Sequence, residues 1–415
     1  MIVPSIDLQG GQTVQLVGGE EKAIDAGDPL PIAQRFAIAG EIAVIDLDAA
    51  MRTGVSNTAL IEPLLRHFTC RVGGGIRDVG TAIGWLDKGA AKVILGTAAS
   101  PEILSQLPRE RVIAALDAKH GEVVVEGWKR GTGRGVFERI AELKAHVGGF
   151  LVTFVEREGR MGGTDLALAR AVVEAAGKEC RVTIAGGVTT PEEIKALDAI
   201  GADAQVGMAL YTGRLDLADA IVAPLTTDRA DGLYPTVVVD ERGVCLGLVY
   251  SSKESIREAV RRRVGVYKSR SRGLWVKGET SGATQELLRV DLDCDRDSPR
   301  FTVRQRGPGF CHENTWTCWG EERGLGRLQR TLAERRRAAP PGSYTTKLLA
   351  DPDLLAAKLR EEAAELAEAR DREHVIWEAA DLLYFTLARL AAAGIDLAEV
   401  EAHLDARARK VTRRG

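Results

Sequence analysis

The sequence predicts a multidomain protein: an α/β (β/α)8 barrel, then a small, mainly-β α+β domain, then an all-α helical domain. Short β-branched runs alternate with amphipathic stretches in the first half, and strand-like runs fill the next hundred residues or so. The last part is rich in Ala, Leu, Glu and Arg. At 415 residues the chain is too long for one ordinary domain. We expect domains at residues 1–225, 226–335 and 336–415.

The first domain alternates strand-like and helix-like segments, which is the pattern of a parallel sheet with helical connections. One helical stretch runs from Pro191 to Ile200. The region's length is near the size of one barrel, about 250 residues. The strand-like runs are Ala43–Asp46, Lys92–Leu95, Val112–Leu116, Phe150–Thr153 and Arg181–Ile184.

The same region repeats itself at an offset of about 110 residues, which indicates two homologous half-barrels. Asp7 corresponds to Asp117, the segment VGGGIR to IAGGVTT, and Gly96 to Gly207. Barrels place their chemistry at the C-terminal ends of the strands. The two carboxylates at these ends suit a general base and a general acid.

Glycine-rich turns at these strand ends would let main-chain N–H groups approach a phosphate. Two symmetric sets suit a substrate that carries a phosphate at each end. The alternative for any one set is a plain tight turn. The predicted phosphate-binding glycines are Gly74, Gly75, Gly96, Gly186, Gly187 and Gly207.

Residues 1–220 resemble ProFAR isomerase, a barrel enzyme of histidine biosynthesis, in segments such as VPSIDLQGGQTVQL, LDAKHGEVVVEGW and VGMAL. The resemblance implies rearrangement of a bisphosphorylated aminoaldose to an aminoketose. It implies Asp7 as general base, Asp117 as general acid and Thr153 at the next strand end. Trp128 would stack on the substrate ring, and Arg77 would belong to a substrate loop.

Three positions depart from the family's pattern. Gln15 stands where an Arg is common, Phe154 where an acid is usual, and Arg160 in place of the Thr of an Asp-Gly-Thr loop. Arg160 could itself hold a phosphate through charge-assisted hydrogen bonds. The changes leave two alternatives: an active isomerase, or a barrel that binds ligand or supports assembly.

Composition gives no general reason to expect nucleic-acid binding, because 56 basic and 59 acidic residues leave a net charge of −3. No apolar run reaches the roughly 18 residues of a membrane span, and the start has no signal-peptide pattern. We therefore expect a cytoplasmic location without a membrane or nucleic-acid partner. Cys70, Cys180 and Cys245 are scattered, and we expect buried, inert thiols there.

A dense group of metal-ligand residues follows in the second domain: Asp293-Cys294-Asp295-Arg296-Asp297, then Cys311-His312 and Cys318. Three thiolates without a fourth nearby ligand suit Zn²⁺ with an open position, where a bound water has a lowered pKa. Alternating Asp293, Asp295 and Asp297 would point one way on a strand and suit Mg²⁺. A structural zinc site or an acidic turn is the alternative.

Residues 230–325 are similar to phosphoribosyl-AMP cyclohydrolase, in SRSRGLWVKGETSG, DCDRD and the Cys-His pair. The resemblance implies hydrolytic opening of the adenine ring. It implies Zn²⁺ on Cys294, Cys311 and Cys318, with His312 in proton transfer. It also implies Mg²⁺ on the three aspartates and dimers that share the zinc site. Candidate nucleotide-binding residues are Arg270, Arg272, Trp275, Lys277, Glu279 and Ser281.

The helical tail places pairs of acids three residues apart beside apolar positions. Glu362 and Glu365 form one pair and Glu378 and Asp381 another, so each pair lies on one face of a helix. Two such helices can build a Mg²⁺ site for a polyphosphate. The alternative is a solvated acidic face.

Residues 343–410 resemble phosphoribosyl-ATP pyrophosphohydrolase in SYTTKLL, KLREEAAELAEA and WEAADLLYFTLARL. The resemblance implies Mg²⁺-assisted hydrolysis of the α–β phosphate bond. It implies a role for Lys358, Glu361, Glu362, Glu365, Glu378 and Asp381. Phe385 stands where the family often has a His.

Together the resemblances imply three consecutive steps of histidine biosynthesis on one chain. We expect phosphoribosyl-ATP and phosphoribosyl-AMP as substrates, Zn²⁺ and Mg²⁺ as cofactors, and a homodimer or higher homo-oligomer. One alternative is a bifunctional hydrolase whose barrel is not catalytic. Another is a metal-dependent house-cleaning nucleotidase or nucleotide-binding module, against which SRSRGLWVKGETSG argues.

Overall fold

The computed structural model describes residues 1–412 apart from Glu20, 126, 127, 129, Arg270, Arg272, 339 and 341. The chain divides into two compact units, Met1–Gly307 with Arg409–Gly415, and Pro308–Ala408. In the described part of the chain, no helix is long and apolar enough to cross a membrane.

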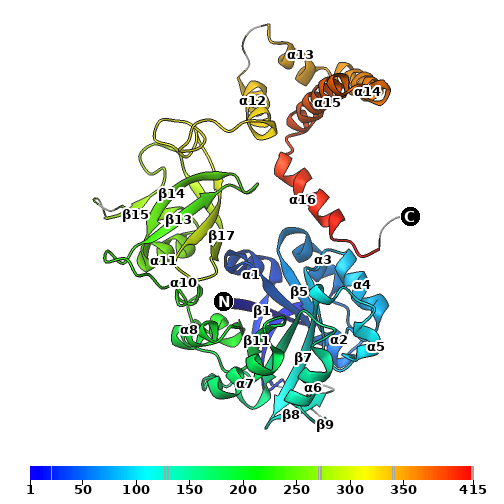
Figure 1. Cartoon of the computed structure of the whole chain (residues 1–415), viewed down its shortest axis with the longest axis vertical. Coiled ribbons are helices and arrows are strands. Elements are labelled where there is room, and N and C mark those ends of the chain that lie inside the picture. The colour runs from blue at the N-terminus through cyan, green and yellow to red at the C-terminus, as the bar shows by residue number, and fades with distance from the viewer. Residues whose placement is uncertain are drawn as a thin grey trace. The chain divides into compact units, whose positions relative to one another are not determined.

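A closed parallel barrel forms the start of the first unit, as the sequence predicts. Among the described residues eight parallel strands form a ring, because β1 pairs with both β4 and β12 and β10 pairs with both β7 and β11. Figure 1 shows helices around this ring. The barrel strands are β1 (Ile2–Gln9), β4 (Ile42–Asp46), β5 (Cys70–Gly73), β6 (Lys92–Leu95), β7 (Val112–Lys119), β10 (Gly149–Phe154), β11 (Arg181–Ala185) and β12 (Ala202–Val206).

Helices connect these strands. The expected helix at Pro191 is α8, and it begins with a capping box in which Thr190 and Glu193 bond each other's main chain. The barrel helices are α1 (Pro29–Phe36), α2 (Leu47–Met51), α3 (Thr58–His67), α4 (Val79–Asp87), α5 (Pro101–Leu104), α6 (Val136–Leu143), α7 (Leu166–Ala176), α8 (Pro191–Ala199), α9 (Met208–Tyr211) and α10 (Leu217–Val222). Short 3-10 turns are η1 (Ala37–Ala39), η2 (Arg109–Arg111) and η3 (Val155–Arg157).

The two halves of the barrel share one plan. β1 continues into the antiparallel pair β2 (Gln12–Val17) and β3 (Glu21–Gly27), and β7 continues in the same way into β8 (Glu122–Val125) and β9 (Arg130–Gly135). Three further parallel strands then complete each half. The repeat seen in the sequence is therefore present in the topology.

The barrel interior is apolar in the middle and charged near the N-terminal ends of the strands. Ile94, Ile113, Leu151 and Ala185 form the apolar layer. Below it Arg71 is 1% exposed, donates to Thr183 Oγ1 at 2.9 Å, and pairs with Glu41. Lys92 also pairs with Glu41, at 3.0 Å. We call this charged layer the barrel floor.

The rest of the first unit is a small α+β fold. Four strands pair in the order β14-β13-β18-β17, and β15 and β16 form a separate two-stranded sheet. Cys245 begins the edge strand β14 and is exposed, so our expectation of a buried thiol there is wrong; Cys70 and Cys180 are buried. The elements are β13 (Tyr234–Val239), β14 (Cys245–Ser251), α11 (Lys253–Arg262), β15 (Val266–Ser269), β16 (Gly273–Val276), β17 (Gln285–Leu292) and β18 (Pro299–Gln305).

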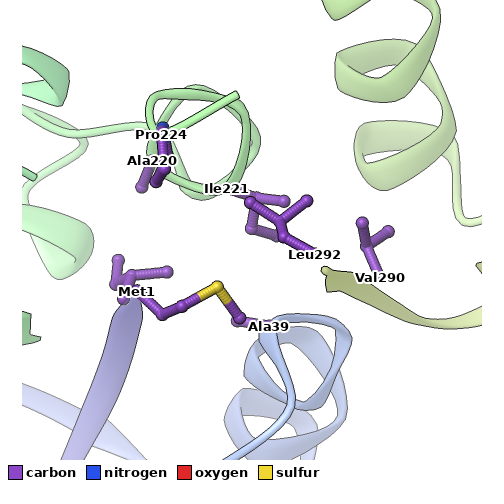
Figure 2. Close-up of a pocket in the computed structure, with 8 residues that line it drawn as sticks. Met1, Ala39, Ala220, Ile221, Pro224, Val290 and Leu292 are labelled. Atoms are coloured by element: carbon purple, nitrogen blue, oxygen red, sulfur yellow. The ribbon is translucent and has the colours of Figure 1, made fainter. Parts of the chain in front are cut away.

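Strand β17 packs its end against the floor side of the barrel. Figure 2 shows Val290 and Leu292 facing apolar barrel residues such as Ile221 and Met1. The cavity left between them measures about 10 Å³, at the lower limit for one water molecule. This close packing ties β17 to the barrel.

The second unit is helical from residue 325 onward, as expected for the tail. Arg335, Arg336 and Arg337 form the exposed C-terminal end of the helix α12. The preceding loop lies on α12, where the Trp316 ring is 3.9 Å from the Arg330 guanidinium. The boundary between the compact units thus falls earlier than our limit of residue 335, and the three predicted domain limits remain predictions. The helices are α12 (Leu325–Arg337), α13 (Tyr344–Ala350), α14 (Pro352–Glu368), α15 (Arg372–Ala393) and α16 (Leu397–Ala408).

We predict that Arg71→Ala destabilises the barrel by about 3 kcal/mol, because it removes a buried charge partner of Glu41. Urea unfolding and hydrogen exchange of β5 and β11 in the full chain would measure the loss. Arg66→Ala is the control, since that side chain is 69% exposed and should cost no more than about 0.5 kcal/mol. Equal losses in both variants would contradict the role of Arg71.

Candidate functional site

The first candidate site lies at the barrel mouth, where the strands end. Asp7 near the end of β1 accepts hydrogen bonds from Ser5 Oγ at 2.8 Å and Gln15 Nε2 at 3.4 Å. Asp117 near the end of β7 is hydrogen-bonded by the side chains of Trp128 and Thr153. Thr153 and Asp117 are register partners on neighbouring strands, so their side chains share one face.

Both aspartates have raised pKa values because they are buried. Burial raises the pKa of Asp7 to about 6, although Ser5 and Gln15 oppose the rise. Burial also raises the pKa of Asp117, against the hydrogen bonds from Trp128 and Thr153. A carboxyl with a pKa near 6 is mostly ionised at neutral pH yet basic enough to take a proton, which suits a general base.

A third carboxylate, Glu158, lies near both aspartates and was not among the residues predicted from the sequence. Burial, Asp7 and Asp117 raise its pKa to about 7. Its carbonyl accepts from Gly18 N at 3.3 Å, which ties the loop after β10 to the hairpin after β1. In the sequence, Glu158 stands where the family's Asp-Gly-Thr loop has its Asp. That acidic residue is the signal that could have identified it.

The predicted cradle glycines are closely packed, except Gly96. A Cβ at Gly74 would lie 2.1 Å from the Asp46 carbonyl oxygen, and one at Gly186 would lie 2.6 Å from that of Phe154. Both have a φ of 93°, which a side chain rarely adopts. Gly75 and Gly187 are crowded by main-chain atoms in the same way, whereas a Cβ at Gly207 would meet the Gln15 side chain. Packing alone therefore accounts for these glycines, and phosphate binding there remains a prediction.

The other barrel candidates differ in how their side chains are used. Arg77 donates to the carbonyls of Ala49, Gly75 and Ala50 at 2.9–3.3 Å, so it holds the end of α2. The Trp128 ring packs on Gly19. Arg160 is exposed and Phe154 is 1% exposed in the core. Gln15 is 3% exposed and fills the space beside Gly207.

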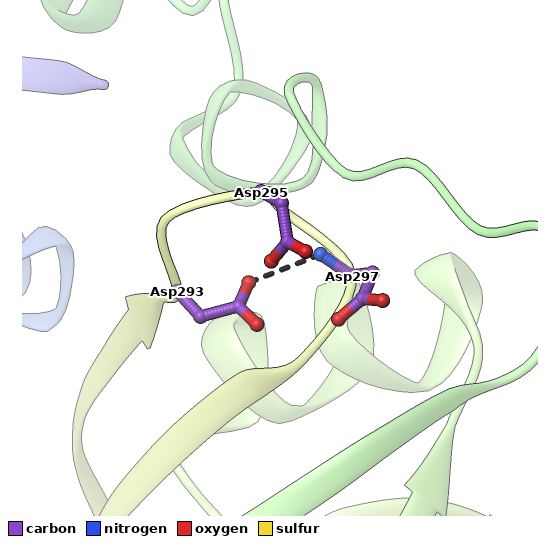
Figure 3. Close-up of side chains that lie close together, drawn as sticks. All are labelled: Asp293, Asp295 and Asp297. Atoms are coloured by element: carbon purple, nitrogen blue, oxygen red, sulfur yellow. Dashed lines mark hydrogen bonds between the residues drawn. The ribbon is translucent and has the colours of Figure 1, made fainter.

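The second candidate site is the acidic loop 293–297, which follows β17. Asp293, Asp295 and Asp297 each offer a carboxylate oxygen within 4.8 Å of the others. Figure 3 shows the three side chains gathered around the turn, with Asp297 N donating to Asp293 Oδ1 at 3.0 Å. Hard oxygen donors in this arrangement fit Mg²⁺.

Asp293, Asp295 and Asp297 come together through a turn, whereas we expected the alternation of a strand to bring them together. β17 ends at Leu292, and residues 293–297 form a turn in which Arg296 has a φ of 67°. The expected strand alternation is therefore wrong. A tight turn brings alternate side chains together here because the backbone reverses at Arg296.

The predicted zinc ligands fall in different compact units. Cys294 is exposed in the first unit, whereas Cys311 and Cys318 lie in the second. Cys311 is buried with its Sγ 3.8 Å from His312 Nδ1, and Cys318 is exposed. None of these thiols forms a disulfide. Three thiols and an imidazole are chemically suited to Zn²⁺, and zinc binding remains a prediction.

The predicted nucleotide residues lie around the hairpin β15–β16. Trp275 packs on Tyr267 with ring centroids 5.3 Å apart, Lys277 is buried and Glu279 is exposed. Ser281 Oγ accepts from Ala283 N at 3.3 Å. Arg270 and Arg272 lie outside the described residues.

The third candidate site lies between α14 and α15. Glu362, Glu378 and Asp381 offer oxygens within 4.8 Å of one another, and Glu362 is 6% exposed. Lys358 Nζ is 2.8 Å from Glu361 and 3.8 Å from Glu362. The position where the family often has a His, Phe385, is in the helical core.

The acids of this site raise each other's pKa. For Glu362 the causes are burial and the neighbouring Glu365 and Asp381, against Lys358. For Glu378 they are burial and the neighbouring Glu365 and Asp381, against His374. A divalent cation would relieve this repulsion, so the donor set fits Mg²⁺.

Comparison with known proteins follows the same division of the chain. A family model described as "Histidine biosynthesis protein" matches residues 1–216. The model for phosphoribosyl-AMP cyclohydrolase matches residues 247–320, and that for phosphoribosyl-ATP pyrophosphohydrolase matches residues 325–408.

Relatives with related descriptions are found in fungi and archaea. The histidine biosynthesis bifunctional protein his7 of Schizosaccharomyces pombe is 53% identical over 201 residues, 48% of each chain. A histidine biosynthesis trifunctional protein of Komagataella pastoris is 49% identical over 232 residues, 56% of this chain and 27% of that protein. A phosphoribosyl-substituted imidazole-carboxamide isomerase of Halobacterium salinarum is 40% identical over 236 residues, 54% of this chain and 96% of that protein.

Fold and sites together define a multidomain protein with a (β/α)8 barrel and two acidic metal-binding candidates. The barrel model covers more than half of the chain, and the archaeal relative is covered almost entirely. The chain belongs to the histidine biosynthesis protein family. It spans about half of the first fungal relative and about a quarter of the second.

We predict that Glu158→Gln stabilises the protein at pH 8 but not at pH 4. The pKa of Glu158 is about 7 in the folded chain and near the ordinary value of 4.5 in the unfolded chain. Ionising Glu158 therefore destabilises the folded state. This destabilisation grows as the pH rises from 4.5 to 7 and is at its full size above pH 7. At pH 8 the gain should be of the order of 2 kcal/mol.

Thermal unfolding of the full chain at both pH values measures this effect. Glu174→Gln is the matched control, since Glu174 is exposed on α7 and should give the same small change at both pH values. A stabilisation by Glu158→Gln that is independent of pH would show that charge is not the cause.

Proposed function

We propose that this chain carries out three consecutive steps of histidine biosynthesis, from phosphoribosyl-ATP through phosphoribosyl-AMP and ProFAR to the aminoketose. The observation that carries the proposal is the match of three family models in chain order, each spanning one candidate site. Asp7 and Asp117 lie in the first match, Asp293 to Cys318 in the second, and Glu362 to Asp381 in the third.

In the tail, the acids on α14 and α15 would hold Mg²⁺ and through it the polyphosphate of phosphoribosyl-ATP. The cation supplies charge neutralisation and a positioned water when bound. Glu361, Glu362, Glu365, Glu378 and Asp381 would hold it. Of these, Glu362, Glu378 and Asp381 offer oxygens within 4.8 Å of one another, and Lys358 adds a positive charge beside them. Hydrolysis would release phosphoribosyl-AMP and pyrophosphate.

In the middle domain, Cys294, Cys311 and Cys318 would hold Zn²⁺ and the three aspartates Mg²⁺. The zinc would activate the water that opens the adenine ring. His312, whose Nδ1 lies 3.8 Å from Cys311 Sγ, would take or give the proton, and the hairpin with Trp275 and Lys277 would bind the nucleotide. The product would be ProFAR.

In the barrel, Asp7 and Asp117 would divide the proton transfers of the isomerisation. Asp7 takes a proton from the sugar carbon, and its pKa of about 6 lets it do so at neutral pH. Burial raises the pKa of Asp117, which is the direction that suits a proton donor to oxygen. Thr153 and Trp128 hold Asp117 in place.

The second candidate function is a bifunctional hydrolase whose barrel no longer isomerises. It is favoured by Gln15 and Phe154, which are buried uncharged side chains at positions where the family usually has charged ones. Three carboxylates near one another also repel an anionic substrate unless a cation accompanies it.

We further propose a homodimer or higher homo-oligomer. The support is a row of exposed apolar side chains on α15: Ile376 at 57%, Trp377 at 69% and Leu383 at 44% exposed. Patches of this kind mark contacts between proteins. The cytoplasmic location expected from the sequence remains a prediction.

The test is a single reaction of the full chain with phosphoribosyl-ATP, Mg²⁺ and Zn²⁺, with products separated by chromatography and identified by mass spectrometry. We expect Asp381→Asn to stop at phosphoribosyl-ATP, Cys318→Ser at phosphoribosyl-AMP, and Asp7→Asn at ProFAR. Each rate should fall by at least about 100-fold, because each change removes a metal ligand or a general base.

The outcomes separate the candidates. Accumulation of the aminoketose by the wild-type chain supports three activities, whereas a stop at ProFAR supports the bifunctional hydrolase. If no ProFAR forms, or ordinary nucleoside triphosphates are hydrolysed faster than phosphoribosyl-ATP, the proposal is wrong.

A further inference from the structure

We propose that Asp198 of the barrel is a positioning residue for the acidic loop 293–297, so that helix α8 of the barrel supports the cyclohydrolase metal site. Asp198 is on α8, about a hundred residues before the loop in sequence. The inference rests on the proposed function, because it takes this loop as a Mg²⁺ site.

The contact is a bidentate salt bridge between Asp198 and Arg296. Arg296 Nε donates to Asp198 Oδ2 at 2.9 Å, and Arg296 Nη2 donates to Asp198 Oδ1 at 3.0 Å. The Asp198 side chain is only 10% exposed and that of Arg296 25%. Such parallel bonds fix the direction of the guanidinium as well as its distance.

Arg296 is also the residue at which the loop reverses. Its φ of 67° costs about 1–2 kcal/mol for a residue with a side chain, so the turn needs support from its surroundings. The same guanidinium donates to the carbonyl of Asp293, which closes the turn. Holding Arg296 therefore holds the acids on both sides of it.

The segment that follows the barrel adds main-chain contacts to the same turn. Thr226 N donates to the carbonyl of Arg296 at 2.9 Å, and Thr226 Oγ1 donates to the carbonyl of Asp295 at 3.4 Å. Leu225, the residue before it, is 1% exposed. The loop is thus held through its side chain and its backbone.

The strand that leads into the loop is held by the barrel as well. Leu292 packs against Met1 and Ile221, and Asp293 is the next residue (Figures 2 and 3). The close apolar contact and the Asp198 ion pair therefore bracket the start and the middle of the loop. Together they fix where the three carboxylates point.

The alternative is that Asp198 merely fastens two parts of the first unit together. A matched control exists, because Asp219 on α10 makes the same kind of contact with Arg257 and Arg261 on α11, the latter at 3.3 Å. Those residues do not belong to the acidic loop. Asp219→Asn therefore removes a fastening contact without touching the loop's own ion pair.

The experiment compares Asp198→Asn and Asp219→Asn in the full chain. An Asp381→Asn background weakens the metal site in the tail, and Mn²⁺ binding is followed by electron paramagnetic resonance. We expect Asp198→Asn to weaken Mn²⁺ binding by about 10-fold or more, as loss of a residue behind a ligand does, and Asp219→Asn to change it less than about twofold.

Two further variants address the side effects of the change. Asp198 also accepts a bond from the Met1 α-amino group at 3.0 Å. Arg296→Gln leaves that bond intact and should weaken Mn²⁺ binding as much as Asp198→Asn does, while Arg296→Lys should restore part of it. Equal Mn²⁺ affinity in the Asp198 and Asp219 variants would overturn the proposal.

A second readout does not depend on the metal. Without metal, the amides of residues 293–298 should exchange hydrogen faster in Asp198→Asn than in Asp219→Asn. If the wild-type chain opens no phosphoribosyl-AMP but this difference is found, the proposed function fails and the positioning role stands. If exchange in the loop is the same in both variants, the positioning role fails whatever the activity.

Discussion

The direction of the barrel strands determines the arrangement of the first unit. Because all eight are parallel, their C-terminal ends meet at one rim and their N-terminal ends at the other. The first rim gathers Asp7, Asp117 and Thr153 from strands far apart in sequence. The other rim receives the charged floor and the end of β17. One closed sheet therefore has a rim that carries the candidate catalytic residues and an opposite rim that packs against the adjoining fold.

Repulsion between neighbouring carboxylates is common to the mouth and the tail. In both places burial and like charges raise the pKa values, as for Glu158 and Glu362. Ionised carboxylates of this kind destabilise the folded state, and binding of a proton or a cation removes the destabilisation. The acidic loop differs, since a turn brings its three aspartates together and Asp293 accepts hydrogen bonds from the main-chain N–H groups of Asp297 and Ser298.

The sequence predicted features that depend on local spacing and missed those that depend on distant contacts. Alternation of strand and helix gave the barrel, and acids three apart gave the cluster between α14 and α15. Spacing could not reveal that Glu158 lies near Asp7 and Asp117, or that α8 contacts the acidic loop. It also suggested a strand for Asp293 to Asp297, because it does not show where the backbone reverses.

The Asp198–Arg296 contact has a consequence for the history of such fusions. A barrel joined to a neighbour by a flexible linker could be lost, exchanged or inherited alone. Here α8 of the barrel holds a turn of the adjoining fold through Asp198, so separating the two at residue 226 would expose Arg296 to water. A mutation at the barrel mouth would then affect the barrel's own site, whereas a mutation of Asp198 would also affect the acidic loop. A barrel of this kind would be retained for its contact with the acidic loop even after losing its own catalytic activity.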